Sequence, residues 1–324
     1  MTYDLAIIGG GPAGVAAGVY ASRKRLKTVF IAREFGGQST VSDGIENWIG
    51  TIKISGADLA KNLEAHLRAY ADDILDIKAG ETVTSVVKIP LSKGGETHAD
   101  VAGVVSPLEK GVPHSDVTYQ AKTVLVTAGS ARRKLEVKGA DALEHKGLTY
   151  CASCDGPLFA DMDVAVVGGG NAGFESAAQL LAYAKSVTLL NRGDDFKADP
   201  VTVKKVLAHP KMKAILGAEI LEVKGDTFVT GLVYQTKESG GSKELPVQGI
   251  FVEIGSSPAT DLLDGLVELT PYKQVIVDPK TQQTSQKGIW AAGDCTDGLY
   301  HQNNIAAGDA VKALEDIYLY LHAS

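Results

Sequence analysis

Two of the three cysteines, Cys151 and Cys154, stand in a C-x-x-C arrangement and are followed directly by Asp155. Sulfurs at this spacing can close a small disulfide ring, and one can act as an attacking thiolate. Asp155 could move a proton to or from the departing thiol, or it could only cap a helix. Zinc would require two further ligands, and an inert buried pair is the other alternative. We expect a dithiol/disulfide centre without a metal, and Cys295 as a small core residue.

The second group of chemically informative residues is a glycine-rich turn near the start of the chain. Gly9, Gly11 and Gly14 have the G-x-G-x-x-G spacing. Such glycines let the backbone turn tightly and approach a pyrophosphate, while the following helix N-terminus supplies N–H donors. Glu34 is the candidate acceptor for a ribose hydroxyl, with a solvated loop charge as the alternative. The flanking pattern predicts a strand, turn, helix and strand over residues 3–8, 9–14, 15–22 and 27–32.

The same pattern returns in the middle of the chain, where Gly168, Gly170 and Gly173 repeat the spacing. The segment that follows decides which nucleotide could bind, because a 2′-phosphate needs cationic side chains and a free 2′-hydroxyl needs an acceptor. One Arg, one Lys and two Asp between Asn191 and Lys197 do not make a good phosphate clamp. The expected strand, turn, helix and strand occupy residues 163–168, 168–173, 174–184 and 186–190.

Other segments must position these motifs. Alternating apolar and polar residues over 77–120, with breaks at 90–95 and 107–113, predict an antiparallel β-meander. Further strand patterns, and then a terminal helix, are predicted over residues 123–129, 249–255, 275–278, 288–294 and 305–322.

Composition narrows the function classes. A chain of 324 residues suggests about two domains. A net charge of −7 disfavours nucleic acid and anionic membrane surfaces as partners. No apolar run reaches the roughly 18–20 residues of a membrane-spanning helix, and the start lacks a secretory pattern. We therefore expect a cytoplasmic location.

Together these motifs resemble the low-molecular-weight thioredoxin reductase family over nearly the whole chain. The residues that carry the resemblance are Gly9–Gly14, Gly36–Gln38, Ile45–Trp48, Cys151–Gly156, Gly168–Gly173 and Ala291–Asp294 followed by His301 and Gln302. The resemblance implies an α/β fold of two Rossmann-like three-layer domains, with a nicotinamide domain inserted in a flavin domain. The expected boundaries are 1–116 and 247–324 for FAD and 117–246 for the nicotinamide nucleotide and the cysteine pair. It also implies a homodimer.

The resemblance further implies which residues bind and react. Cys154 would face the flavin, Cys151 would attack the partner's disulfide, and Asp155 would donate a proton. The expected FAD-binding residues are Gly9, Gly11, Pro12, Ala13, Gly14, Glu34, Gly37, Gln38, Asn47, Val83, Gly129, Gly293, Asp294, Gln302 and Asn303. The expected nicotinamide-nucleotide residues are Gly168, Gly170, Asn171, Ala172, Gly173, Asn191, Arg192 and Lys197.

Two features depart from the family pattern. The family's NADPH motif, His-Arg-Arg-x-x-x-Arg, becomes Asn191-Arg192-Gly193-x-x-x-Lys197, which favours NADH over NADPH as the electron donor. Cys154–Phe159 and Lys197–Asp199 are also similar to the reductase half of the alkyl hydroperoxide reductase flavoprotein, which uses NADH. His301 replaces the usual Arg.

The resemblance implies a flavin disulfide reductase that passes electrons through FAD and the cysteine pair to thioredoxin or another small dithiol protein. Four alternatives remain. The donor could be ferredoxin, with the second glycine-rich turn as a relic, or the enzyme could serve a peroxiredoxin system. The chain could also be a flavin-bearing redox sensor without turnover. A ferredoxin–NADP reductase of the same fold is disfavoured because those relatives lack the cysteine pair.

Overall fold

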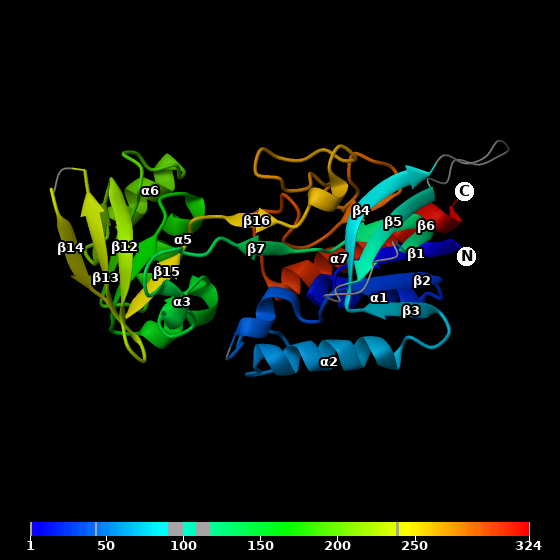
Figure 1. The fold of residues 1–324 in the computed structure, drawn as a ribbon, viewed down its shortest axis with the longest axis horizontal. Helices are drawn as coiled ribbons and strands as arrows, with labels where there is room; N and C mark the ends of the chain where they lie inside the picture. Colours follow the sequence, from blue (N-terminus) through cyan, green and yellow to red (C-terminus); the bar gives the residue numbers. More distant parts are fainter. Residues whose placement is uncertain (1, 43, 90–99, 108–116, 238–239, 324) are drawn as a thin grey trace. The chain divides into compact units, whose positions relative to one another are not determined.

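The chain forms two compact units in a computed structural model that describes residues 2–42, 44–89, 100–107, 117–237 and 240–323 (Figure 1). Unit 1 comprises Met1–Ala131 and Ser257–Ser324, and unit 2 comprises Arg132–Ser256. Unit 2 is therefore inserted in the sequence of unit 1. The first division lies later than the expected boundary at 117 because the strand that begins at Val117 pairs inside the sheet of unit 1. The second lies later than the expected boundary at 247 because Gly249–Val252 pairs inside the sheet of unit 2.

Unit 1 is built on a sheet with the order β3-β2-β1-β6-β5-β4, in which β17 also pairs with β6. Neighbours among β3, β2, β1, β6 and β17 are parallel. The strands are β1 (Thr2–Ile8), β2 (Thr28–Ala32), β3 (Leu75–Ala79), β4 (Glu81–Ile89), β5 (Asp100–Pro107), β6 (Val117–Val126) and β17 (Ile289–Ala291). All five residues of β2 are buried, as expected for a parallel strand covered on both faces.

Helices cover one face of this sheet. The core on that face joins α1, α2 and α7 to side chains such as Phe30, Leu125 and Trp290. The helices of unit 1 are α1 (Pro12–Arg23), α2 (Gly56–Ala69) and α7 (Asn303–His322), with the short 3₁₀ helices η1 (Gly37–Val41) and η3 (Asp261–Leu263). The opposite face forms a second core that includes Val124, Leu263 and Val275. This arrangement makes unit 1 a three-layer structure.

Unit 2 repeats the parallel architecture with the strand order β11-β10-β9-β15-β8. An antiparallel sheet, β12-β13-β14, contributes to the core on one face. The strands are β8 (Leu148–Thr149), β9 (Asp163–Val167), β10 (Ser186–Leu190), β11 (Met212–Ile215), β12 (Ala218–Gly225), β13 (Val229–Thr236), β14 (Ser242–Pro246) and β15 (Gly249–Val252). The helices are α3 (Ala140–Leu143), α4 (Ala152–Asp155), η2 (Gly156–Phe159), α5 (Asn171–Leu180) and α6 (Pro200–Leu207). The predicted two-domain α/β fold is confirmed.

The chain passes between the units twice, and the two passages pair as a small sheet. β7 (Ser130–Arg132) and β16 (Ser256–Pro258) form this two-stranded sheet. The passages are therefore held by backbone hydrogen bonds, such as the one from Arg133 N–H to the Gly255 carbonyl at 3.0 Å.

Some predicted elements differ in detail. β4, β5 and β6 form the expected antiparallel meander, but β3 instead pairs in parallel with β2. The break expected at 90–95 lies outside the described residues, as does the one at 107–113 apart from Pro107, which ends β5. The strand predicted at 275–278 is a set of isolated bridges, because Val275 pairs singly with Leu269 and Thr296. α5 ends at Leu180, before a turn at 181–183.

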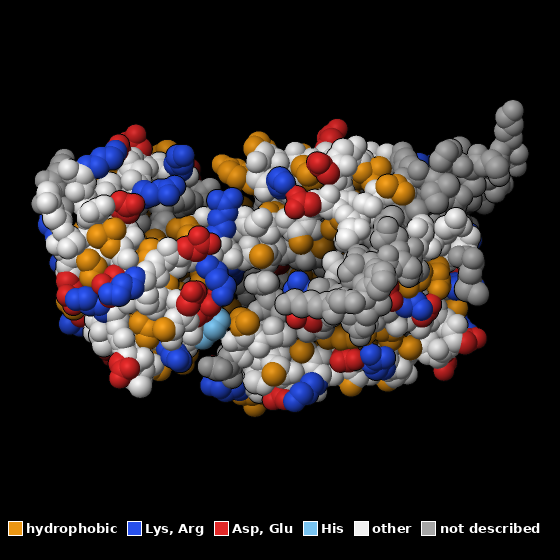
Figure 2. Space-filling model, in the orientation of Figure 1, with side chains coloured by type: hydrophobic (Ala, Val, Ile, Leu, Met, Phe, Trp, Pro, Cys, Tyr) orange, Lys and Arg blue, Asp and Glu red, His pale blue; other side chains and the backbone are white. Residues whose placement is uncertain are grey.

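Positive and negative side chains are mixed on the surface seen in Figure 2. Several are paired, including Lys138 with Glu222 and Lys224 with Glu244 on β12 and its neighbours. Within the described part of the chain, none of the helices has the length and apolar character needed to cross a membrane.

Candidate redox and nucleotide sites

Cys151 and Cys154 are joined in a disulfide, with their Cα atoms 5.3 Å apart. Cys151 is the residue before α4, and its Sγ accepts a hydrogen bond from the Cys154 N–H at 3.2 Å. Both cysteines are half-buried. The remaining cysteine, Cys295, is fully buried, and burial raises the pKa of its thiol to about 11. Cys295 is therefore a core residue, as expected, and the reactive sulfur lies in the pair.

The carboxylate of Asp155 is held next to this pair. Its Oδ2 accepts a hydrogen bond from the Thr149 hydroxyl at the end of β8. Asp155 is the residue before η2, yet its side chain makes no capping hydrogen bond to that helix. The alternative that Asp155 only caps a helix is therefore wrong for η2.

The first glycine-rich turn is shaped by close backbone contacts. Gly9 has a φ of +122°, and a Cβ there would collide with the Thr127 carbonyl. A Cβ on Gly14 would collide with the Gly9 carbonyl, whereas the Cβ position of Gly11 faces open space. Thr127 supports the turn because its hydroxyl donates to the carbonyl of Ile8 at 2.9 Å. The turn is thus packed on one side and open on the other.

The open side of this turn meets the start of a helix. Gly11 precedes α1, no side chain caps that helix, and Pro12 and Ala13 form its first turn. The first N–H groups of a helix lack internal partners and favour an anion. Glycine at the open position leaves room for a pyrophosphate to approach the backbone. The residues therefore fit the phosphate groups of a dinucleotide.

The loop that contains Glu34 and Gly37 lies against the same turn. A Cβ on Gly10 would collide with the Glu34 carbonyl, and the Gly36 N–H donates to the Gly10 carbonyl at 2.9 Å. Gly37 begins η1, which also contains Gln38. Glu34 therefore lies near the turn. Its carboxylate is exposed and already forms an ion pair with Arg33 at 2.9 Å.

A third group of expected residues meets at the start of α7. Asn47 Nδ2 donates to Gln302 Oε1 at 3.0 Å, and Ser39 Oγ donates to Asn303 Oδ1 at 2.9 Å. Asn304 Nδ2 also donates to the Asn47 carbonyl at 2.7 Å. These bonds join two segments that are more than 250 positions apart in the sequence.

Gly293 connects this group with the first turn. A Cβ on Gly293 would lie 3.4 Å from the Cβ of Ala13 in α1 and 3.2 Å from the Cβ of Ala306 in α7. Asp294, the next residue, therefore lies close to the N-terminal turns of both helices. The structure thus brings the expected FAD-binding residues of these segments together within unit 1.

Two other expected FAD-binding residues, and one residue that departs from the family pattern, also lie in unit 1. The Val83 side chain is buried in a core cluster, so only its backbone could contact a ligand. Gly129 has a φ of +69° and precedes the passage to unit 2. His301 replaces the family's Arg, and its Nε2 is a buried atom without a hydrogen-bond partner among the described residues. An unpaired buried nitrogen beside Gln302 is consistent with a missing polar ligand.

The second glycine-rich turn repeats the geometry of the first in unit 2. Gly168 has a φ of +134°, and a Cβ there would collide with the Glu253 carbonyl. A Cβ on Gly173 would collide with the Gly168 carbonyl, whereas the Cβ position of Gly170 faces open space. Asn171 and Ala172 open α5, whose N-terminus no side chain caps. This turn also fits a pyrophosphate.

The segment after β10 is organised by Asn191. Its Nδ2 donates to the carbonyls of Gly193 at 3.1 Å and Asp195 at 2.9 Å, so the amide is used to shape its own loop. Lys197 lies at the turn because its N–H donates to the Gly169 carbonyl at 2.9 Å. Arg192 is exposed, and no ion pair is recorded for it among the described residues. The loop presents one free guanidinium and no cluster of cations.

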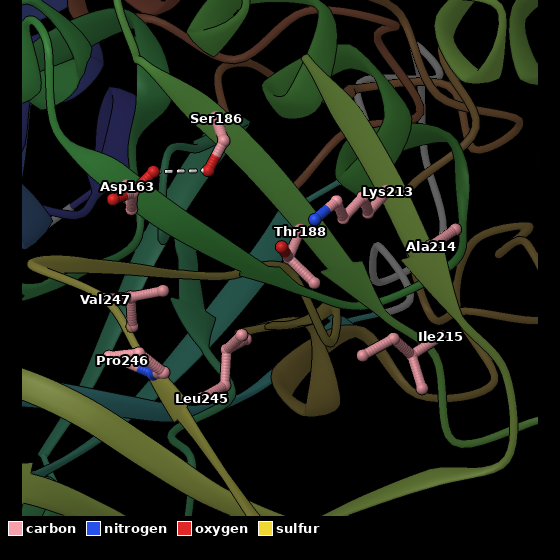
Figure 3. Close-up of a pocket in the computed structure, with 9 residues that line it drawn as sticks. All are labelled: Asp163, Ser186, Thr188, Lys213, Ala214, Ile215, Leu245, Pro246 and Val247. Atoms are coloured by element: carbon pink, nitrogen blue, oxygen red, sulfur yellow. Dashed lines mark hydrogen bonds between the residues drawn. The ribbon is translucent and has the colours of Figure 1, made fainter. Parts of the chain in front are cut away.

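The cavity shown in Figure 3 is a separate feature of unit 2. It has a volume of about 550 Å³ and is lined by residues such as Asp163, Thr188 and Lys213. Asp163 and Ser186 begin β9 and β10, and a hydrogen bond of 2.6 Å joins them. Dinucleotides bind beyond the carboxyl ends of parallel strands. This cavity reaches the amino ends of β9 and β10 and is not the glycine-rich site.

The structure adds residues that the sequence patterns did not single out. Thr149, Ser39 and Asn304 each bond a residue that was expected to act or bind. Thr149 lies within six residues of Asp155, and Asn304 lies within six residues of Gln302. In the sequence, only the hydroxyl of Thr149 and the amide of Asn304 indicated that these side chains can form such bonds. Glu253 and Ser176 flank the second turn and form a hydrogen bond across 77 positions, which leaves no local signal.

Comparison with known sequences places the chain in a family. The sequence pattern of the pyridine nucleotide-disulphide oxidoreductases matches residues 3–310. An alkyl hydroperoxide reductase protein of Escherichia coli (strain K12) is 38% identical over 320 residues, and a protein named NADH dehydrogenase of Bacillus subtilis (strain 168) is 36% identical over 319. Each alignment covers 98% of this chain and 58% of the relative. The chain thus spans under three fifths of the length of these relatives.

Solved structures of similar length share the fold. Thioredoxin reductase from Giardia duodenalis has a TM-score of 0.87 and 30% identity, with 99% of both chains covered. Thioredoxin reductase from Streptococcus pyogenes MGAS5005 has a TM-score of 0.84 and 30% identity, with 100% of this chain and 99% of that chain covered. The disulfide, the two glycine-rich turns and these matches agree. The chain therefore belongs to the pyridine nucleotide-disulphide oxidoreductase family and is similar to thioredoxin reductases over its whole length.

Proposed function

We propose that this protein uses NADH, bound FAD and the Cys151–Cys154 disulfide to reduce a disulfide in a thioredoxin-like protein. The observation that carries the proposal is the presence of two open glycine-rich turns together with a C-x-x-C disulfide in one chain. FAD, when bound, takes a hydride from the reduced nicotinamide and passes two electrons to the disulfide. In this proposal unit 1 binds FAD, and unit 2 binds the nicotinamide nucleotide and carries the cysteines.

The two cysteines have different roles in the proposal. Two electrons and two protons convert the disulfide into two thiols. The Cys151 thiolate then attacks the partner's disulfide and forms a mixed disulfide, and Cys154 resolves it, so that the partner leaves with both sulfurs reduced. The hydrogen bond from Cys154 N–H to Cys151 Sγ supports this assignment, because such a donor stabilises a thiolate on Cys151. Cys154 is then the sulfur that faces the flavin.

Asp155 is the proposed proton donor to the departing thiolate. Thr149 holds one oxygen of this carboxylate from the end of β8. A fixed carboxyl group beside the disulfide can move a proton during each exchange step. Thr149 is accordingly a positioning residue, and Asp155 is the group that handles the proton.

The preference for NADH over NADPH rests on the loop after β10. The family's cationic motif would present several cations to a 2′-phosphate, but here Asn191 turns its amide inward and Gly193 has no side chain. Arg192 and Lys197 are the remaining cations, and Asp194 is already paired with Lys237 at 2.7 Å. The relative named NADH dehydrogenase is consistent with this preference.

A small protein partner is favoured by the surface around the disulfide. Leu158, four residues after Cys154, is 65% exposed, and the exposed ring of Tyr183 lies 3.7 Å from the Cβ position of Gly156. Exposed apolar side chains at a reactive site favour docking of another protein. The proposal also includes the homodimer that the resemblance implies and the cytoplasmic location expected from the sequence.

The experiment is an anaerobic titration of the oxidised FAD-bound protein with NADH and, separately, with NADPH, following flavin absorbance. We expect fast bleaching by NADH, slow bleaching by NADPH, and reduction of added thioredoxin disulfide. A protein that is colourless and cannot be reconstituted with FAD contradicts the proposal. A flavin that stays oxidised with both nucleotides points instead to a donor such as ferredoxin.

A second candidate acceptor is a dithiol protein of a peroxiredoxin system. Several relatives of 35–39% identity are named as parts of an alkyl hydroperoxide reductase, which supports this alternative. Peroxide consumption in the presence of a peroxiredoxin, with and without added thioredoxin, separates the two acceptors.

A further inference from the structure

Glu253 lies beside the second glycine-rich turn, at the carboxyl end of β15. Its N–H donates to the Val167 carbonyl at 2.8 Å, and its own carbonyl occupies the space that a Cβ on Gly168 would need. β9 lies between β10 and β15 in the sheet. β9 and the second glycine-rich turn therefore have β10 on one side and Glu253 on the other.

The topology determines which half of a dinucleotide Glu253 would face. In such sheets the ligand lies across the carboxyl ends of the strands, at the point where the strand order reverses. The adenosine half lies toward the strand after the turn, which is β10 here, with Asn191 at its end. The nicotinamide half then extends to the other side of the pyrophosphate, over β15 and Glu253.

The Glu253 side chain is fixed but not fully occupied. Ser176, a buried residue of α5, donates from Oγ to Glu253 Oε1 at 2.6 Å. Among the described residues no hydrogen bond is recorded to Glu253 Oε2, so that oxygen is available to a ligand. Burial raises the pKa of Glu253, while the Ser176 hydrogen bond and the charge of Arg132 oppose this, and Glu175 adds to it.

We propose that Glu253 is a specificity-determining residue that favours the oxidised nicotinamide ring over the reduced ring through its carboxylate. The inference rests on the proposed function, in which a nicotinamide dinucleotide binds at Gly168–Gly173. When the dihydronicotinamide ring gives up a hydride, two electrons and a proton pass to the flavin and the ring becomes a cation. A carboxylate held close to that ring attracts the cation and leaves the neutral, reduced ring unaffected. Ser176 is the positioning residue that holds this carboxylate.

The test measures binding to the oxidised FAD-bound protein by isothermal titration calorimetry with three probes. NAD⁺ has a cationic ring, 1,4,5,6-tetrahydro-NAD has a neutral ring that cannot donate hydride, and ADP-ribose has no nicotinamide. The variant is Glu253→Gln, which keeps the shape and the hydrogen bond from Ser176 but removes the charge. Glu219→Gln is the matched control, because it removes the same charge from an exposed position on β12, and Glu219 is not among the groups that shift the Glu253 pKa.

We expect Glu253→Gln to weaken NAD⁺ binding about fivefold and to leave the other two probes unchanged. Glu219→Gln should change none of the three. Equal weakening of all probes, or no weakening of NAD⁺, overturns the inference while the proposed function stands. A wild-type protein that binds neither NAD⁺ nor ADP-ribose overturns the proposed function as well. A thermal melt of the variant confirms that unit 2 is folded.

Discussion

Asn47 Nδ2 donates to Gln302 Oε1 over 3.0 Å and joins two segments separated by 255 positions. Gln302 directly precedes α7, and its side chain does not cap that helix. The hydrogen bond therefore connects the loop after η1 to an uncapped helix N-terminus. This contact holds together two of the segments expected to bind the flavin.

The first prediction concerns this contact. Gln302→Ala should weaken FAD binding about fivefold, since a hydrogen bond of this kind contributes about 1 kcal/mol. The measurement is the FAD dissociation constant of the apoprotein, followed by flavin fluorescence. Gln283→Ala is the control, because Gln283 bonds Asp316 elsewhere in unit 1 at 3.0 Å. Equal weakening in both variants contradicts a specific role for Gln302.

The sequence predicted the parts of the site that depend on neighbouring residues. The turns at 9–14 and 168–173 and the pair Cys151–Cys154 are local patterns, and each appears in the structure with the required backbone conformation or bond. Local spacing determines these features because glycine at a positive φ, or two sulfurs three residues apart, needs no distant partner.

Features that depend on distant contacts were not predicted from the residues alone. Ser176 and Glu253 form a hydrogen bond across 77 positions, and nothing in either local segment indicates it. Residues 275–278 have a strand pattern but form only single bridges, because an extended segment becomes a strand only with a continuous partner. Asn47 and Gln302 were recognised only through the family resemblance.

The second prediction separates the cysteines. Cys154→Ser should lower disulfide reduction by at least about a thousandfold and should trap Cys151 in a mixed disulfide with the partner. Cys295→Ala should retain activity, because Cys295 is buried with a thiol pKa of about 11. Mass spectrometry of the trapped complex and a turnover assay measure both outcomes. A mixed disulfide formed through Cys154 in a Cys151→Ser variant, and none through Cys151, would reverse the two roles.

The third prediction compares two glycines of the same turn. Gly170→Ala should keep the stability of the protein, because the added Cβ meets no protein atom, yet weaken NAD⁺ binding at least about tenfold by entering the pyrophosphate position. Gly173→Ala should instead destabilise unit 2, since its Cβ collides with the Gly168 carbonyl. Thermal unfolding and calorimetric titration test both variants. Tight NAD⁺ binding by Gly170→Ala means that the pyrophosphate lies elsewhere.

The fourth prediction concerns the choice of nucleotide. Gly193 is exposed in the loop that Asn191 shapes, so Gly193→Arg can add a cation without displacing a buried group. The variant should raise kcat/KM for NADPH about tenfold, as a charge-assisted contact to the 2′-phosphate would give. The value for NADH should change little. A wild-type protein that already prefers NADPH contradicts our interpretation of this loop.

The fifth prediction uses two carboxyl groups of unit 2 whose pKa values move in opposite directions. Burial raises the pKa of Glu253 above the ordinary glutamate value of 4.5. The folded state therefore loses stability as the pH rises from 4.5 to the higher pKa of the folded state. Hydrogen bonds from Ser186 and Lys185 lower the pKa of Asp163, so this group stabilises the folded state at neutral pH and that stability is lost on acidification below 3.8.

Removing each charge should therefore have opposite effects. At pH 7, Glu253→Gln should raise the melting temperature and Asp163→Asn should lower it, each by about 1–3 °C. The Glu253→Gln difference should shrink as the pH falls toward 4.5, because the wild-type carboxyl group then takes up a proton. The Asp163→Asn difference should shrink only on acidification below 3.8. Thermal melts in matched buffers between about pH 3 and pH 7 give both curves. If both substitutions raise the melting temperature, or both lower it, the two carboxylates do not have opposite effects on stability.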